Sequence, residues 1–206
     1  IETCQALGRI NIKVLAAGSI FLGDMKEPIT GTKEGPKALN FGIPFTLRPK
    51  ALRFDYRVHV PGNANRIRQT GFSKVTTVPG KDYCVALLLL QRRHEDAHGN
   101  ITAQRVGTVV VKYGKSTNGW VEDATYEIHY GNITGKSFYD ASMMGLRSTD
   151  YARNSKGKSV LVKETGWADA DATPTHIVLQ FSSSHGGAYV GTVGNTFWVD
   201  NVGLVY

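Results

Sequence analysis

The alternation of apolar and polar residues is clearest over residues 52–60. A period of two is typical of a strand that buries one face and turns the other toward solvent. We therefore predict a half-buried strand here. Its apolar face consists of Leu52, Phe54, Tyr56, Val58 and Val60, and its polar face of Arg53, Asp55, Arg57 and His59.

Residues 82–92 show a different pattern, because their apolar residues fall on both faces. A short run of this kind is typical of a strand buried on both sides, so we predict a central strand. The run is far shorter than the roughly 18 apolar residues that a membrane-spanning helix needs.

Weaker patterns complete the outline of the secondary structure. Apolar alternation or short apolar runs predict strands over residues 10–15, 18–23, 101–104, 106–113, 120–130 and 159–162. A short helix is predicted within residues 138–150. Glycine and proline predict loops over residues 24–41 and 63–80.

The C-terminal residues 175–206 contain two apolar runs, 175–181 and 196–206, around a Ser- and Gly-rich connection. We predict that these two strands pair, and that the last strand lies inside a sheet because an exposed apolar edge promotes aggregation. Trp198 is expected in the core. Asp200 is expected to point inward, where it would bind amides of residues 191–195 or a structural calcium ion.

Strands that follow one another without intervening helices indicate an all-β fold built as an antiparallel two-sheet sandwich. The length of 206 residues fits one domain, residues 1–206. The chain starts at Ile1 rather than at a methionine, so we expect an internal start within a longer or processed protein.

The net charge of +7 does not by itself predict that the protein binds nucleic acid. The basic clusters at Arg66 and Arg68, at residues 92–93 and at residues 153–158 lack the interleaved aromatic residues that such a surface needs. An acidic ligand such as a charged sugar remains open. Cys4 and Cys84 allow either one disulfide or two free thiols.

Several catalytic and metal sites are not predicted. The six histidines lack the spacing of a zinc site. Ser182, Ser183 and Ser184 precede His185, but no Gly-x-Ser-x-Gly elbow surrounds them, so these hydroxyls are expected to satisfy backbone groups at the strand end. The later glycines are not followed by a phosphate-binding helix.

Carbohydrate binding is the chemistry that the remaining residues favour, since aromatic rings stack on sugars and polar groups bind their hydroxyls. Trp120 and Trp167 lie in glycine- and polar-rich sequence typical of loops, where they either bind a ligand or plug the core. A polar face that lines a sugar groove, or is merely solvated, consists of Arg53, Asp55, Arg57, His59, Glu127 and His129. Asp55 and Glu127 are also candidates for the carboxylate pair of a glycoside hydrolase.

Several motifs together resemble the putative carbohydrate metabolism domain found in exported proteins of anaerobic gut bacteria. The resemblance covers roughly residues 18–206. This sequence has Ala188 at a position where family members often carry an acidic residue. The matching motifs are Gly42-Ile43-Pro44-Phe45, Arg48-Pro49, residues 52–56, Asp82 with its apolar strand, residues 120–130, Ser182-Ser183-Ser184, Gly186-Gly187, Tyr189, Gly191, Gly194 and Trp198-Val199-Asp200.

The resemblance implies a jelly-roll sandwich similar to carbohydrate-binding modules, an upstream immunoglobulin-like domain, and export to the periplasm or cell surface. It also implies a glycan ligand, and it supplies no catalytic residues. We therefore predict a non-catalytic glycan-binding module. The alternatives are a glycoside hydrolase and a structural or adhesion domain of a cell-surface assembly.

Overall fold

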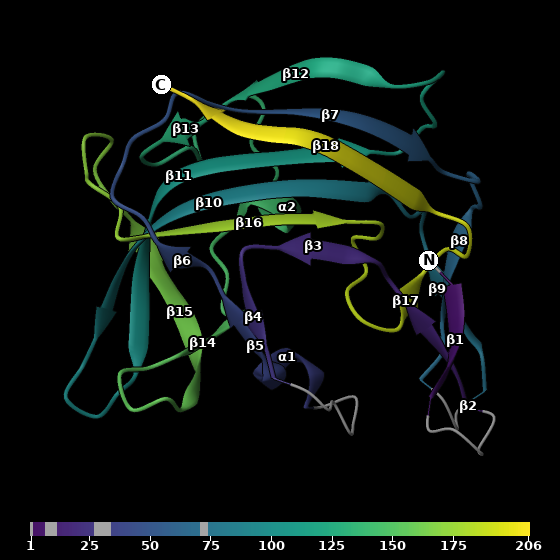
Figure 1. Ribbon diagram of the computed structural model, residues 1–206, viewed down its shortest axis with the longest axis horizontal. Helices are drawn as coiled ribbons and strands as arrows, with labels where there is room; N and C mark the ends of the chain where they lie inside the picture. The colour runs from purple at the N-terminus through teal and green to yellow at the C-terminus, as the bar shows by residue number, and fades with distance from the viewer. Residues whose placement is uncertain (1, 7–11, 27–33, 71–73) are drawn as a thin grey trace.

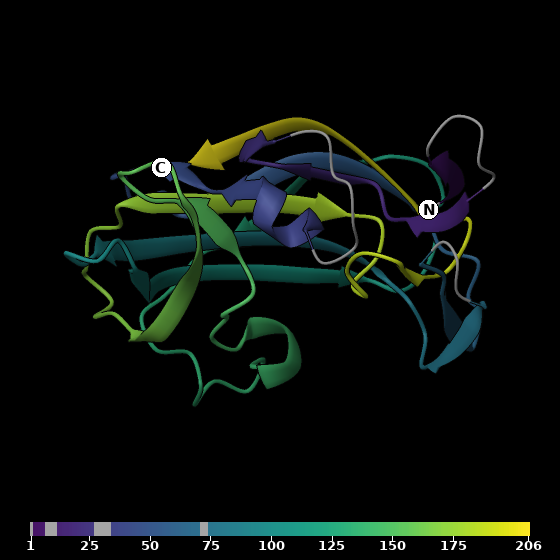
Figure 2. The same ribbon diagram turned by 90° about the horizontal axis from the view of Figure 1, so that it is seen from below.

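The computed structural model describes residues 2–6, 12–26, 34–70 and 74–206, and this part of the chain is nearly all β (Figure 1). Two sheets of unequal width pack face to face, as Figure 2 shows from the side. The predicted all-β class and the two-layer sandwich are confirmed, whereas the jelly-roll strand order stays a prediction. No helix in the described ranges is long and apolar enough to cross a bilayer.

The larger sheet contains eight strands. Among the described strand pairs, only β11 and β15 run parallel, so the antiparallel prediction fails at this one place. The main path runs β14 (Tyr151–Arg153), β15 (Ser159–Trp167), β11 (Ile101–Tyr113), β10 (Cys84–Glu95), β16 (His176–Ser182) and β3 (Ser19–Phe21), while β13 (His129–Tyr130) joins β11 and β6 (Ile43–Pro44) joins β16.

The smaller sheet has the order β12 (Val121–Glu127), β7 (Ala51–His59) and β18 (Thr196–Val205). Its central strand β7 is the half-buried strand predicted from alternation. Leu52 and Phe54 are fully buried, whereas Arg53 and Arg57 are exposed.

Strand β10 has a hydrophobic layer on each side. Ala86 and Leu88 belong to the core between the two sheets. Val85 and Leu87 belong to a second cluster on the outer face, which includes Phe41 from β5 (Leu39–Phe41). The predicted central strand is therefore confirmed. Cys84, at its start, is a buried free thiol, and burial raises the pKa of that thiol to about 12.

Smaller elements lie around the sandwich. Residues 24–41 and 63–80 were predicted as loops. This is wrong for the short strands and the helix that the structure describes there, whereas residues 63–64, 69 and 74–75 carry neither. Residues 10–11, 27–33 and 71–73 of the predicted strand and loops lie outside the described residues. The elements are β1 (Glu2–Ala6) with β2 (Ile12–Ala16), β4 (Gly23–Met25) with β5, β8 (Asn65–Arg68) with β9 (Thr76–Pro79) and β17 (Val190–Gly191), and helices α1 (Gly35–Ala38) and α2 (Ala141–Met144).

The predicted C-terminal strand pair is wrong. Strand β16 pairs with β10 in the larger sheet, and β18 pairs with β7 in the smaller one. Strand β18 is also the last strand of its sheet rather than an interior strand. The Ser- and Gly-rich connection therefore crosses from one layer to the other, although its composition is the same as that of a hairpin loop.

A buried ion pair joins β11 to β15. The side chains of Arg105 and Glu164 are 0% and 1% exposed. The Arg105 Nε donates to Glu164 Oε1 over 2.7 Å, and Gln91 donates to the same oxygen over 2.6 Å. Trp167 lies at the end of β15, where the Arg105 guanidinium carbon is 5.5 Å from its ring centroid. The prediction that Trp167 sits in a loop is therefore wrong.

Replacing Glu164 with Gln should lower the free energy of unfolding by about 3–5 kcal/mol, because Arg105 would keep a buried charge without a counter-charge. Urea denaturation measures this change. The matched control, Glu34→Gln, removes the exposed ion pair with Lys37 and should cost less than about 1 kcal/mol. Equal losses in the two variants would contradict the role assigned to the buried pair.

Acidification should destabilise the fold through His176. Burial and the nearby Arg93 lower the pKa of His176 to about 4. An unfolded histidine titrates near 6.5, so between about pH 6.5 and 4 the unfolded state binds a proton that the folded state does not. The free energy of unfolding should therefore fall across this window. His176→Gln should flatten that slope in urea titrations at several pH values, whereas the exposed His98→Gln should leave it unchanged.

Candidate functional site

The outward face of the smaller sheet collects most of the predicted ligand-binding residues. Arg53, Arg57 and His59 of β7 are exposed on it. On the neighbouring strand, Trp198 lies directly opposite Arg57 and Asp200 opposite Asp55. Directly paired residues point to the same side of a sheet, so β7 and β18 contribute to one continuous surface.

Two predictions about β18 are wrong. Trp198 is 40% exposed and not in the core, and Asp200 points to solvent. The strand is irregular between Asp200 and Gly203, so Phe197 and Val199 pack inward before this point and Leu204 after it. The irregularity changes which positions face the core, and strict alternation could not show that.

The calcium hypothesis at Asp200 loses its basis with this orientation. The Asp200 carboxylate accepts the backbone N–H of Asn201 over 2.8 Å at the surface. Within the described ranges, no three or more His, Cys, Asp or Glu side chains gather in a way that could hold a metal ion.

Two exposed indoles lie in the chain segments on either side of β7. The Arg57 guanidinium carbon lies 5.0 Å from the centroid of the Trp198 ring. On the other side of β7, Val121 pairs with the inward-facing Tyr56. Trp120, directly before Val121, is 47% exposed, and alternation places it on the outward side beside Arg57. We call Trp120, Trp198, Arg57, Arg53, Asp55 and His59 the tryptophan face.

Asp55 is held as a carboxylate within the tryptophan face. One of its oxygens accepts the Asn201 side-chain amide over 2.6 Å, and the other accepts the backbone N–H of Asp123 over 2.6 Å. These two hydrogen bonds, aided by the nearby Arg53, lower the pKa of Asp55. Such a group accepts hydrogen bonds but is a poor proton donor.

Asp55 and Glu127, the carboxylate pair considered from the sequence, lie at separate positions along the smaller sheet. Glu127 pairs with Ala51, four residues away from Asp55 along β7. Four residues of strand span about 13 Å. Glycoside hydrolases place their two carboxyl groups roughly 5–9.5 Å apart.

His129 and Trp167 do not join the tryptophan face either. The chain leaves the smaller sheet after Glu127, and His129 pairs with Thr108 in the larger sheet. There, its ring stacks on Phe138 with 4.2 Å between centroids. Trp167 lies on β15 in the same sheet. The prediction that residues 120–130 form one strand is therefore wrong at Ile128, where the chain changes layers.

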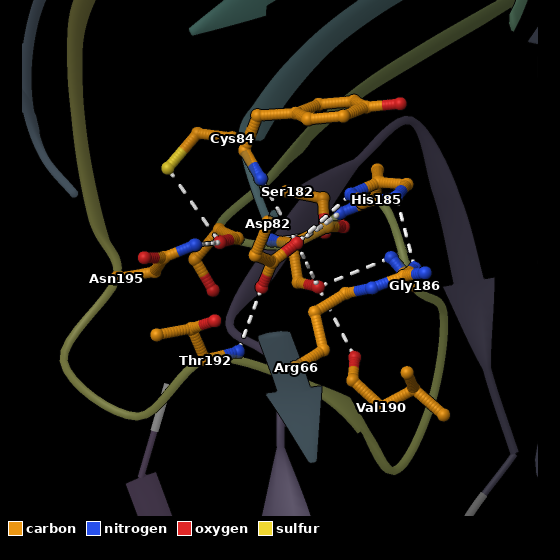
Figure 3. Close-up of polar contacts among 12 residues, drawn as sticks. Arg66, Asp82, Cys84, Ser182, His185, Gly186, Val190, Thr192 and Asn195 are labelled. Carbon is orange, nitrogen blue, oxygen red and sulfur yellow. Dashed lines mark hydrogen bonds and ion pairs between the residues drawn. The ribbon is translucent and has the colours of Figure 1, made fainter. Parts of the chain in front are cut away.

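Sequence reasoning missed a polar cluster that surrounds Asp82 (Figure 3). Asp82 is 3% exposed. Its Oδ1 accepts the Ser184 hydroxyl and His185 Nδ1, each over 2.9 Å, and its Oδ2 accepts the Thr192 N–H over 2.8 Å. Burial alone would raise the pKa of Asp82, but the hydrogen bonds outweigh it and hold the pKa below its usual value. Asp82 thus has the loop-anchoring role that was predicted for Asp200.

His185 is fixed on all sides. Its Nδ1 donates to Asp82, and its Nε2, 2.9 Å from the Arg66 guanidinium, accepts from it. Its ring stacks on Tyr83 with 3.7 Å between centroids. The next residue, Gly186, leaves no room for a side chain, since a Cβ would lie 2.6 Å from the Val190 carbonyl oxygen.

The serine run has the structural role that was predicted for it. The Ser182 hydroxyl donates to the Ser184 carbonyl over 2.8 Å, and the Ser183 hydroxyl to the Gly18 carbonyl over 3.3 Å. The Ser184 hydroxyl contacts Asp82, while His185 Nε2 is occupied by Arg66. The arrangement is therefore not that of a serine nucleophile with its histidine base.

The chain belongs to the putative carbohydrate metabolism domain family, whose model matches residues 1–205. A comparison with curated proteins gives no match.

Two solved structures share the fold, both titled as crystal structures of a putative glycoside hydrolase. The one from Bacteroides thetaiotaomicron VPI-5482 has 16% identity and a TM-score of 0.52, and the match covers 98% of this chain and 55% of that one. The one from Bacteroides vulgatus ATCC 8482 has 17% identity and a TM-score of 0.50, with 92% and 64% covered. The chain thus spans less than two thirds of either.

Asp82→Asn should lower the free energy of unfolding by about 3 kcal/mol at pH 7, because an amide cannot accept all the hydrogen bonds that converge there. Wild type should lose the same stabilisation below about pH 4, because the folded pKa is lowered and the contribution ends as the carboxylate protonates. The difference in free energy of unfolding between wild type and Asp82→Asn, measured by urea denaturation, should therefore become smaller in acid. Asp169→Asn, at an exposed position, is the control. A difference that does not become smaller would contradict the charged role of Asp82.

Proposed function

We propose that this chain is a non-catalytic glycan-binding module and that the tryptophan face binds the glycan. The observation that carries the proposal is the pair of exposed indoles, Trp120 and Trp198, in the chain segments on either side of β7. Membership of a carbohydrate metabolism family supports a carbohydrate ligand.

The chemistry of the tryptophan face suits a sugar. An indole ring offers a flat apolar surface to the C–H face of a pyranose, and polar groups beside it bind the hydroxyls. Arg57 stacks on Trp198 and limits the rotation of its indole. Arg53 and His59 supply donors around the rings, and Asp55 supplies acceptor oxygens.

The spacing of the indoles favours an oligomeric ligand. Trp198 and Trp120 belong to chain segments on opposite sides of β7, so two strand spacings, or about 10 Å, separate their backbones. A single sugar ring is too short to stack on both indoles. The proposed ligand is therefore a polysaccharide segment lying across the three strands.

Glycoside hydrolysis is the alternative, because the two solved structures with this fold are described as putative glycoside hydrolases. It needs a carboxylic acid whose pKa is raised so that it can protonate the leaving group. The carboxyl groups with a shifted pKa in the described residues, Asp55, Asp82, Glu95, Asp96 and Asp140, are all shifted downward. Together with the distance between Asp55 and Glu127, this favours binding over hydrolysis.

The same proposal places the module in a protein exported to the periplasm or cell surface, where polysaccharides are accessible. It also includes a further upstream domain, so the module would hold a larger protein on its polymer.

Affinity electrophoresis in gels that contain soluble xylan, β-glucan, mannan or pectin tests the tryptophan face. At least one polymer should retard the wild type. Trp120→Ala and Trp198→Ala should each weaken binding about tenfold or more, equivalent to about 1.4 kcal/mol. Phe138→Ala is the matched control, because it removes an exposed aromatic ring that stacks on His129 in the other sheet.

Other outcomes would identify the alternatives. Release of reducing ends by the wild type, and its loss in Asp55→Asn or Glu127→Gln, would establish a hydrolase. Failure to bind any polymer, combined with tight capture of a protein partner, would indicate a structural or adhesion domain. Full retardation of both tryptophan variants would show that the tryptophan face is not the binding surface.

A further inference from the structure

A groove of about 440 Å³ lies on the outer face of the larger sheet. Helix α2 lies on this side of the sandwich and β18 on the opposite side (Figure 2). Its floor combines Val85 and Leu87 of β10 with their cross-strand partners Ser182 and Gln180 of β16. One wall is formed by α2 and the residues that follow it, and the other by the loop around His185. Small-molecule sites commonly have volumes of roughly 300–1,000 Å³.

The wall formed by α2 is braced against the sheet. Asp140 caps the helix by accepting the Ser142 N–H over 3.0 Å, and its carboxylate also pairs with Lys112 of β11. The Tyr83 hydroxyl contacts Met143 Sδ over 3.3 Å. The short helix is therefore attached to the sheet at both of its ends.

The opposite wall is braced by the Asp82 cluster (Figure 3). Asp82 and Arg66 hold the two ring nitrogens of His185. Tyr83 links the two walls, because its ring stacks on His185 while its hydroxyl contacts Met143. A groove with both walls fixed in this way loses little conformational entropy when a ligand binds.

The charges around the groove are compensated. Arg147 pairs with Asp150 over 2.9 Å, and Asp140 pairs with Lys112. His185 donates from Nδ1 and accepts at Nε2, which is the bonding pattern of the uncharged ring. A charged ligand would therefore meet charged groups that are already paired.

The lining combines uncharged polar groups with an apolar surface. Met143 and Leu146 extend the apolar floor up the wall. Five of the 14 lining residues carry an uncharged hydroxyl or amide: Ser142, Thr149, Gln180, Ser182 and Ser184. Each of these groups already donates a hydrogen bond within the protein, which fixes its orientation. A hydroxylated ring can donate to their oxygens and place its C–H face on the apolar lining.

We infer that this groove is a second carbohydrate site, which binds one or two rings of a neutral sugar. The inference rests on the proposed glycan-binding function and deepens it: the tryptophan face binds an extended polymer, and the groove binds a short sugar or a chain end. Gln180 and Ser182 on the floor bind hydroxyls, and Met143 covers a C–H face.

Amide chemical-shift titrations of the full chain test the groove. The probes are glucose, galactose, mannose, xylose, cellobiose and lactose, with glucuronate as the charged comparator. At least one neutral sugar should shift resonances concentrated in residues 141–149 and 180–187, and glucuronate should bind more weakly than glucose.

Two variants should weaken the binding of that sugar. Gln180→Ala removes a hydrogen-bonding group and should raise Kd roughly three- to tenfold. Ala141→Trp fills the groove from the exposed start of α2 and should abolish the shifts. The matched controls are Gln104→Ala and Ala97→Trp at exposed positions outside the groove, and melting temperatures confirm that each variant is folded. If Ala141→Trp does not fold, the affinity of Gln180→Ala and the location of the amide shift changes in the wild type still test whether the groove binds the sugar.

The groove proposal is overturned if no neutral sugar shifts these residues, if glucuronate binds more tightly than glucose, or if the controls weaken binding as much as the groove variants. If polymers retard the protein through Trp198 but no sugar changes the amide shifts of the groove residues, the proposed function stands and the groove is not a sugar site. If a sugar changes those amide shifts but no polymer retards the protein, the groove is a sugar site and the tryptophan face is not the polymer-binding surface.

Discussion

The fold depends on a strand that is apolar on both faces. Strand β10 exposes almost none of residues 84–91, and each fully buried leucine contributes about 1.5–3 kcal/mol only if a layer covers it. The smaller sheet covers one face, and β5, α2 and neighbouring side chains cover the other. The second cover is narrower, and the groove lies beside α2 over Val85 and Leu87 of β10 and over β16. The groove thus follows from the same constraint that builds the core.

Asp82 lies two residues before β10 and holds the loop that crosses from β16 in one sheet to β18 in the other. A buried carboxylate is costly unless donors surround it. Here the donors come from Tyr83, Ser184, His185 and Thr192, so the loop can satisfy the carboxylate only when it lies across the end of the sandwich. This requirement also explains Gly186, because the loop folds so tightly around Ser184 that a Cβ would clash with Val190.

The sequence was informative where one physical rule acts locally. Alternation predicted β7, a run apolar on both faces predicted β10, and Asp140 with the following residues marked α2. It was uninformative where the outcome depends on distant partners. The irregularity after Asp200 reversed the inward positions of β18, and the break at Ile128 moved His129 into the other sheet. The sequence therefore predicted the exposed polar side of β7, but Trp198 was assigned to the core and Asp82 was not recognised as the loop anchor.

The two proposed carbohydrate surfaces lie on opposite sides of the sandwich. The tryptophan face is built on the outer side of β7 and β18, and the groove on the outer side of β10 and β16, with the main core between them. They share no residue, and substitutions at well-separated sites without common partners contribute additively. Binding at one surface therefore leaves the other available. If a polymer on one side and a short sugar on the other bind together, the sandwich joins two parts of a polysaccharide, a role that neither surface could perform alone.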